Sequence, residues 1–268
     1  MKYYSRNSLT MSTIFRRLAS TAPYLTPEKP EKIKQLLKPL GVLTKPLSMP
    51  NDEKKSFQER KADFLDVKKN RIRREELKEE FAKSSFDHIY GMRDTGGKIF
   101  TAPPKMFTDD EALYMPNIVG KSLTDTFGGE TTLLQLLSTK ETNIVRMFSS
   151  SLGQQQIKEF TKDLDLGHLG VRLVDVNTPT SWVNRLLVKW SKKSIQKSEI
   201  GENEDFHKYL IASQTLTPAL RKSIGASNIL AGYLYVVDVN GKIRWATSGA
   251  TMADEKQRLL NVLKSLKI

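Results

Sequence analysis

The chain has 268 residues, 38% of them hydrophobic and 27% charged, which suits one core domain with additional segments better than two full domains. It contains no cysteine, which excludes disulfides, thiol nucleophiles, CxxC redox chemistry and cysteine metal sites. The formal net charge of +13 is typical of proteins that bind nucleic acid, anionic lipid or an acidic partner. His88, His168 and His207 lack metal-ligand spacing, so we expect neither a metal nor a cofactor.

Residues 1–22 have the composition of a mitochondrial presequence. The first acid of the chain is Glu28, and the stretch before it is rich in hydroxyl residues and contains four basic residues. Its segment 16–20 (RRLAS) resembles a matrix-peptidase site, which predicts cleavage between Leu18 and Ala19. A disordered basic tail is the alternative interpretation. Removing four basic residues from 43 leaves 39 against 30 acids, a net charge of +9.

Residues 23–51 and 52–110 precede the expected core domain. The first segment contains six prolines and little periodicity, which indicates an extended linker. In the second, residues 52–83 are highly charged with a thin apolar edge, which favours a long solvated helix over an RNA- or membrane-surface helix. The rest is a Gly- and Pro-rich arm. Its Gly96-Gly97-Lys98 lacks the spacing and the preceding strand of a phosphate-binding loop, so we reject that interpretation.

Residues 111–268 alternate between expected strands and helices. Strands are expected at 143–149 and 171–176, and helices at 131–137, 153–164, 180–193, 206–212 and 218–224. The serines at 149–151 are suited to cap the helix that follows them.

The segment 232–249 (GYLYVVDVNGKIRWATSG) predicts a hairpin. Asn240-Gly241 is a strong signal for a two-residue turn, because both residues tolerate positive φ. That turn would pair Val236 with Trp245 and place Ile243 and Trp245 on one face of the sheet. Trp245 is expected in the core.

A closing C-terminal helix follows the hairpin. Thr251 is expected to cap it, and Asp254 and Glu255 suit its positive end. Two strands joined by a helix, then an antiparallel pair and a closing helix, follow the order of a thioredoxin-like domain. We therefore predict an α/β fold, with a thioredoxin-like domain at 111–268 behind an extended helical N-terminal arm.

Thioredoxin-like enzymes carry their reactive thiols at the start of the helix after the first of these strands. The corresponding positions here are the serines at 149–151 and Leu152. A serine nucleophile needs a base, and no histidine lies nearby in the sequence. No proline precedes the strand expected at 233–237, where redox members place a cis-proline. We predict that the chain is not an enzyme.

Several short motifs carry a resemblance to a known family. They are Gly96-Gly97-Lys98, 112–117 (ALYMPN), 120–123 (GKSL), 145–148 (VRMF), Asn228, Gly249 and a hairpin signature, Gly232, Tyr233, Asp238, Gly241, Arg244 and Trp245. With these motifs, residues 55–266 resemble the mitochondrial ATP synthase assembly factor ten family. One departure is Met115, where an aromatic residue is expected.

The resemblance implies a non-catalytic, thioredoxin-like chaperone, peripheral on the matrix side of the mitochondrial inner membrane. Its implied partner is newly made subunit a of the ATP synthase membrane sector, which it helps to join the subunit c ring. No apolar run reaches 18 residues, which favours peripheral membrane contact. A mitochondrial ribosome- or RNA-associated factor is the alternative, on the net charge and the charged helix. No RNA-stacking motif is present, so nucleic acid is not expected as a partner.

Two places are candidates for contact with the client or the membrane. The segment 180–193 predicts a helix with tryptophans on one face and basic residues beside them, namely Trp182, Arg185, Lys189 and Trp190. Packing of that face on the sheet is an equally good interpretation. Arg244 is the second candidate, with pairing to Asp87 or Asp94 as its alternative.

Overall fold

The computed structural model describes residues 33–47, 97–123, 130–179 and 207–267, together with Arg71, Ile89 and Thr95. The chain divides into two units, Met1–Lys32 and Ile33–Ile268, and every described residue belongs to the second unit. The predicted presequence and the predicted helix at 180–193 therefore lie outside the described residues, and of the charged helix at 52–83 only Arg71 is described.

Short strands and helices follow one another along the described part of the chain. They are β1 (Lys34–Gln35), β2 (Phe100–Thr101), β3 (Val119–Ser122), β4 (Glu130–Thr132), α5 (Leu133–Leu136), β5 (Thr142–Phe148), α6 (Ser151–Thr161), α7 (Leu166–Leu169), β6 (Val171–Asn177), β7 (His207–Ala212), α10 (Pro218–Ser223), β8 (Tyr233–Val237), β9 (Ile243–Ser248) and α11 (Ala253–Leu266).

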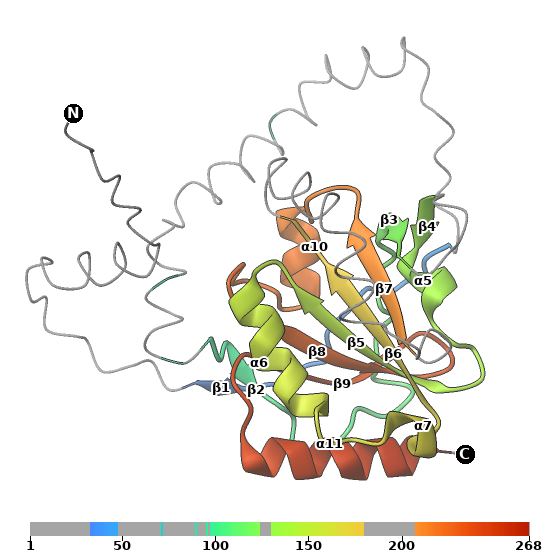
Figure 1. The fold of residues 1–268 in the computed structure, drawn as a ribbon, viewed down its shortest axis with the longest axis vertical. Coiled ribbons are helices and arrows are strands. Elements are labelled where there is room, and N and C mark those ends of the chain that lie inside the picture. The colour runs from blue at the N-terminus through green and yellow to red at the C-terminus, as the bar shows by residue number, and fades with distance from the viewer. Residues whose placement is uncertain are drawn as a thin grey trace, which may run out of the picture. The chain divides into compact units, whose positions relative to one another are not determined.

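A seven-stranded mixed sheet, in the order β4-β3-β7-β6-β5-β8-β9, forms the centre of the fold (Figure 1). The three central strands β7, β6 and β5 are parallel, and each flanking strand is antiparallel to its neighbour. All seven residues of β5 are buried, as are all five of β8. This is the pattern expected for strands covered on both faces of a sheet.

Each face of the sheet carries its own hydrophobic cluster. On one face, α6 and α11 contribute Ile157, Phe160, Leu259 and Leu263 to the cluster that contains Trp245. Figure 1 shows α6 crossing in front of the sheet and α11 along the lower side of the view. On the opposite face, α5 and the segments at 36–40 and 100–118 supply the covering side chains.

The predicted α/β class and thioredoxin-like element order are confirmed. Strands β5 and β6 are parallel neighbours joined through α6, and β8, β9 and α11 close the chain.

One predicted helix is wrong, because residues 206–212 contain strand β7 instead. Tyr209 and Ile211 belong to the cluster on the α6 face, whereas Leu210 and Ala212 belong to the opposite cluster. Alternation with a period of two defines a strand. A short apolar run that is buried on both sides gives the same sequence signal as a buried helix, which explains the error.

The predicted two-residue hairpin turn is also wrong. Gly241 has a φ of 83°, but Asn240 does not have the positive φ that a two-residue turn of this kind requires. Instead, the Gly241 amide donates to the Asp238 carbonyl at 3.0 Å, and the Asp238 amide donates to the Lys242 carbonyl at 3.0 Å. The Asp238 carboxylate accepts the amides of Asn240 and Lys242, both at 2.9 Å, which stabilises a three-residue loop.

The longer loop changes which residues share a face. Val236 pairs with Trp245 as predicted, but a register shift pairs Val237 with Ile243. Ile243 therefore packs in the cluster with Tyr235, while Trp245 packs on the opposite face and is 0% exposed. The prediction that Ile243 and Trp245 share a face is wrong, because a bulge adds one residue between them.

The predicted cap of the C-terminal helix is wrong as well. The residue that precedes α11 is Met252, whose side chain makes no capping hydrogen bond. The Thr251 hydroxyl is buried and has no hydrogen-bond partner among the described residues. At the start of α6, in contrast, Ser150 accepts the Gly153 amide at 2.9 Å, so the predicted serine cap is confirmed.

Residues 33–47, which we call the strap, lie against the domain in extended conformation. β1 pairs in parallel with β2, and the Leu36 amide donates to the Thr101 carbonyl at 3.0 Å. Further along, Val42 forms a β-bridge with Tyr114. A proline-rich segment can follow a surface in this way because it needs few backbone donors of its own. The strap thus covers part of the face opposite α6.

We expect Gly241→Ala to lower the free energy of unfolding by about 1 kcal/mol, because a Cβ is disfavoured at positive φ. A Cβ there would meet no atom within 4 Å, so the cost is conformational rather than steric. Gly167→Ala, whose Cβ would lie 3.7 Å from the nearest atom, is the matched control and should not destabilise. Urea denaturation measures both, and equal stability of the Gly241→Ala protein and the parent would contradict this view of the turn.

Candidate functional site

The start of α6 is the position of the reactive thiols in thioredoxin-like enzymes, and here hydroxyl groups occupy it. The Ser150 hydroxyl donates to the Leu230 carbonyl at 2.8 Å while it accepts the Gly153 amide. The hydroxyls of Ser149 and Thr178 lie 2.7 Å apart. Ser150 therefore holds the start of α6 in place, and among the described residues neither serine is paired with a base that could activate it.

Close contact between two glycines leaves little space beside this helix start. A Cβ on Gly232 would lie 2.1 Å from the Gly153 carbonyl oxygen, and one on Gly153 would lie 2.7 Å from the Ala231 carbonyl carbon. Both distances are far below van der Waals contact. The first turn of α6 therefore packs directly on the backbone that leads into β8. The cavity beside it has a volume of about 20 Å³, which is room for one water molecule.

A buried ionic network lies on the α6 face of the three parallel strands. Arg146 on β5 binds Asp175 on β6 with two hydrogen bonds, Nε to Oδ1 and Nη2 to Oδ2, both at 2.6 Å. Its Nη1 donates to the Thr161 hydroxyl at 2.9 Å, and His207 Nε2 lies 2.9 Å from Asp175 Oδ2. Each strand contributes one member, since Arg146 lies directly opposite Asp175 and His207 lies two residues from the position opposite Asp175. The network therefore joins β5, β6 and β7 through their side chains.

Asp175 is held as a carboxylate. Burial raises the pKa of Asp175, but the charge of Arg146 and the hydrogen bonds from His207 and Arg146 oppose it, and the pKa is held well below 3.8. An open hollow of about 390 Å³ lies over this network and is lined also by Lys158, Glu159 and Lys162. Within the described ranges no group of three or more histidine and acidic side chains is placed to hold a metal ion.

The hairpin signature fastens a covering segment to the outer edge of the sheet. Arg244 Nε donates to the Phe107 carbonyl at 2.8 Å, and the Phe107 amide donates to the Arg244 carbonyl at 2.8 Å. Arg244 Nη1 lies 3.1 Å from Asp238 Oδ2, the acid that also organises the turn. The Ile243 amide donates to the Leu113 carbonyl at 2.8 Å. Residues 107–115 therefore occupy an edge that would otherwise expose backbone groups.

The remaining signature residues also contribute to packing. The Tyr233 hydroxyl accepts the Asn228 amide at 2.8 Å and donates to the Asn228 carbonyl at 2.9 Å, which closes the loop before β8. Burial raises the pKa of Tyr233, so this hydroxyl stays protonated. With Gly232 against α6, Gly241 in the turn and Trp245 in the core, all six signature residues have a structural explanation.

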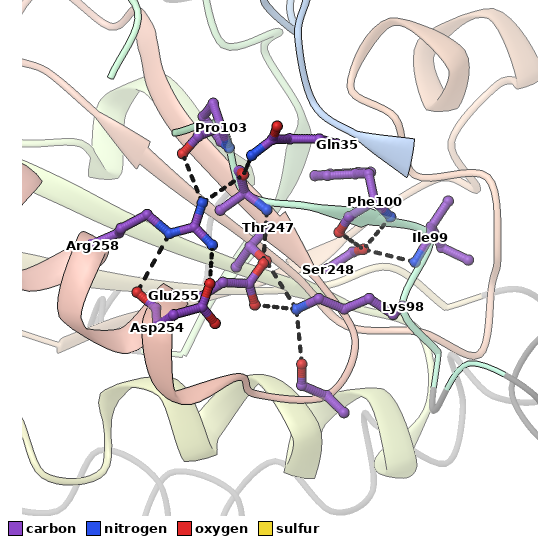
Figure 2. A network of polar contacts seen from close by, with 12 residues as sticks. Gln35, Lys98, Ile99, Phe100, Pro103, Thr247, Ser248, Asp254, Glu255 and Arg258 are labelled. Carbon is purple, nitrogen blue, oxygen red and sulfur yellow. Dashed lines mark hydrogen bonds and ion pairs between the residues drawn. The ribbon is translucent and has the colours of Figure 1, made fainter. Parts of the chain in front are cut away.

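A second buried ion pair joins two segments that are far apart in the sequence, as Figure 2 shows. Lys98 Nζ forms a salt bridge with Glu255 on α11 and donates to the Ala250 carbonyl at 2.8 Å and the Thr247 hydroxyl at 3.2 Å. Glu255 Oε1 accepts the Ala102 amide at 2.7 Å and the Thr247 hydroxyl at 3.0 Å. Lys98 is 3% exposed and Glu255 is 0% exposed. Burial lowers the pKa of Lys98, against the influence of Glu255.

The backbone of residues 97–100, next to Lys98, is also in close contact with residues 248–249 at the end of β9. The Ser248 hydroxyl accepts the amides of Ile99 and Phe100, each at 3.0 Å, and donates to the Phe100 carbonyl at 3.0 Å (Figure 2). A Cβ on Gly249 would lie 2.3 Å from the Gly97 carbonyl. The sequence motif that includes Gly97 and Lys98 therefore holds this segment against β9 rather than binding phosphate.

The network around Lys98 was not predicted from the sequence. Its signal was present, because Glu255 precedes the buried Leu259 and Leu263 by four and eight residues and so lies on the core side of the helix. An acid at such a position needs a buried cation. From the sequence, Lys98 belongs to Gly96-Gly97-Lys98, a rejected phosphate-binding loop and one motif of the family resemblance, and is not predicted as a partner of Glu255.

The predicted contact residues are placed as follows. Leu18, Ala19, Trp182, Arg185, Lys189 and Trp190 lie outside the described residues, as do Asp87 and Asp94, the acids suggested for Arg244. The Arg244 side chain is 12% exposed and is engaged by Asp238 and Phe107, so the structure brings it to the turn and the covering segment. Its contact with a client stays a prediction. In the described part of the chain no helix is both long and apolar enough to span a bilayer.

Comparison with known proteins gives matches along most of the chain. The model of the family described as ATP10 protein matches residues 22–266. The mitochondrial ATPase complex subunit ATP10 of Candida glabrata is 30% identical over 245 residues, covering 89% of this chain and 86% of that protein. Its namesake in Saccharomyces cerevisiae is 28% identical over 283 residues, covering 99% and 98%. A solved thioredoxin-like protein in its oxidized form has a TM-score of 0.40 and 21% identity, covering 57% of this chain and 97% of that one.

We expect Asp175→Asn to cost about 3–5 kcal/mol of stability at neutral pH, because it leaves the buried Arg146 without its counter-charge. Since the pKa of Asp175 is lower in the folded chain than 3.8, the unfolded chain binds more protons in acid. The contribution of Asp175 to the free energy of unfolding is therefore fully present above the pKa that Asp175 has in the unfolded chain. It is lost as the pH falls below that value. Urea denaturation between neutral and acid pH should show the difference between parent and variant shrinking, and a constant difference would contradict this.

We expect Lys98→Met to cost about 3 kcal/mol or more, because Glu255 would be left buried and uncompensated. Lys162→Met is the matched control, since Lys162 and Glu159 form an exposed pair whose loss should cost at most about 1 kcal/mol. Amide hydrogen exchange gives a local readout, because the Ala102 amide is bonded to Glu255. Its exchange should accelerate in Lys98→Met and stay at the parental rate in the control. Equal effects of the two substitutions would contradict the central role of the buried pair.

Proposed function

Because the chain belongs to the ATP10 protein family, we propose that it is a chaperone for assembly of the membrane sector of mitochondrial ATP synthase. In this proposal it binds newly made subunit a and promotes its joining to the subunit c ring. The observation that carries the proposal is the family match over residues 22–266. Two curated relatives named mitochondrial ATPase complex subunit support it, since they align with this chain over most of their own lengths.

We propose that the protein acts by binding rather than by catalysis. The chain has no cysteine, so the thiol chemistry of thioredoxin-like enzymes has no reactive group in this sequence. At the start of α6, Ser150 serves as a helix cap and Gly153 packs on Gly232, which leaves room for little more than a water molecule. These contacts support a fold retained as a binding scaffold.

We propose a location at the matrix side of the inner membrane, with peripheral attachment. The names of the relatives support a mitochondrial location, and the composition of residues 1–22 supports a presequence cleaved between Leu18 and Ala19. The helix predicted at 180–193, with Trp182 and Trp190, is proposed as a surface for the client. The comparisons give no support to the ribosome- or RNA-associated alternative.

The test is native immunoprecipitation of the protein from solubilised mitochondria after a short pulse-label of mitochondrial translation. We expect labelled subunit a in the precipitate with little of the other translated chains, and less of it when Trp182 and Trp190 are both replaced by alanine. The melting temperature of the purified variant separates contact from folding, because a contact role predicts a larger effect on association than on stability.

Two controls make the outcome decisive. Mitochondria without tagged protein give the background, and normal recovery of the variant protein shows that it accumulates. Absence of subunit a from the parental precipitate would contradict the proposed client. Ribosomal RNA with an even mixture of translated chains would instead support the alternative function.

A further inference from the structure

The strap exposes three leucine side chains although its other leucines are turned inward. Leu37, Leu43 and Leu47 are 73%, 84% and 68% exposed. Leu36 is buried, and Leu40 packs against the core cluster on the face opposite α6. Large apolar side chains that gather on one exposed segment mark a surface that contacts a protein or a membrane.

The backbone between these leucines is fixed to the domain at several points. The Gly41 amide donates to the Ser223 carbonyl of α10 at 2.8 Å. The Tyr114 amide donates to the Val42 carbonyl at 3.0 Å, and the Asn117 side-chain amide donates to the Leu47 carbonyl at 2.8 Å. The exposed leucines are thus presented by an ordered segment, so little conformational entropy remains to be lost on binding.

The charge of the strap is of one sign. Lys34, Lys38 and Lys45 are exposed, and residues 33–47 contain no acid. The exposed Lys222 precedes the Ser223 carbonyl that holds Gly41, which adds a further cation at this place. The acids nearest along the covering segment are at 109–111, and Asp109 among them is paired with Lys242. Alternating leucine and lysine therefore present apolar and cationic groups together.

The arrangement indicates a flat, anionic and partly apolar partner. The exposed leucines are spread over residues 37–47 of a segment that is bonded along the domain surface, which suits a broad partner surface better than one small ligand. A transmembrane helix of a client would accept the leucines but offers no anions to the lysines. A bilayer surface offers both, because lysine and apolar side chains bind together where anionic headgroups meet acyl chains.

We propose that the strap is the surface by which the protein lies on an anionic lipid bilayer, with Leu37, Leu43 and Leu47 inserted and the lysines among the headgroups. The inference rests on the proposed function, which brings the protein to a membrane. It places the bilayer contact on the face opposite α6, where the strap crosses the sheet (Figure 1, blue).

Vesicle flotation with the purified full chain tests the proposal. The probes are phosphatidylcholine vesicles and vesicles of phosphatidylcholine with phosphatidylglycerol. We expect binding only to the anionic vesicles, and we expect salt to weaken that binding.

Replacing Leu37, Leu43 and Leu47 by serine should reduce vesicle binding roughly tenfold or more, since the apolar burial of each leucine in the bilayer is lost. The control replaces Leu152 and Met252, exposed apolar residues elsewhere, and should bind as the parent does. Parental binding by the strap variant, or equal binding to neutral vesicles, overturns the proposal.

A second measurement does not depend on the multiple variant. Since the chain has no cysteine, Leu43→Cys provides a unique thiol for a polarity-sensitive fluorophore. We expect a blue shift when phosphatidylglycerol vesicles are added, and none for the same label at Leu152→Cys. The absence of a shift at position 43 overturns the proposal, and crosslinking of that thiol to a protein in mitochondria without vesicle binding would assign the strap to a protein partner. If subunit a still co-precipitates in either case, the proposed function stands while the lipid surface fails.

Discussion

The salt bridge between Lys98 and Glu255 is the interaction on which the arrangement of the whole described chain depends. It joins a segment that enters the fold after the N-terminal arm to the helix that ends it, and almost all of both side chains is removed from water. Two buried charges stabilise a fold only when each is satisfied, and here the Ala102 amide, the Thr247 hydroxyl and the Ala250 carbonyl complete their hydrogen bonds. The bond from the Ala102 amide to Glu255 holds the end of β2 against α11, and β2 in turn pairs with β1 of the strap.

The signature residues of the hairpin are best understood in the same terms. Asp238 organises a turn, Arg244 fastens residues 107–115 and Tyr233 closes a loop, so each acts on backbone groups that would otherwise lack partners. Arg146 and Asp175, in contrast, join the neighbouring strands β5 and β6 by bonds between their side chains. The hairpin residues therefore complete the turn and the outer edge of the sheet. The surfaces that bind a partner need not coincide with these residues.

Much of the fold could be predicted from the sequence, because hydrophobic period and turn residues are local signals. β5, β6, α6, α10 and the pairing of Val236 with Trp245 follow from them. The strand β7 could not be distinguished from a helix, since a short segment buried on both faces lacks a diagnostic period. The hairpin register depends on hydrogen bonds of the Asp238 side chain, which the turn propensity of Asn240-Gly241 does not reveal. The cation that Glu255 needs is a lysine 157 residues away, which no local pattern specifies.

The strap and the closing helix have a consequence for the order in which the molecule can fold. Gly41, Leu36 and Lys98 belong to the part of the chain that is synthesised early, yet their partners include Ser223, Thr101 and Glu255. A contact across 157 residues forms only after the intervening chain is available, and closing so long a loop is slow. Lys98 can therefore take its place only after α11 has been made, and a chain truncated before α11 would leave Lys98 without Glu255.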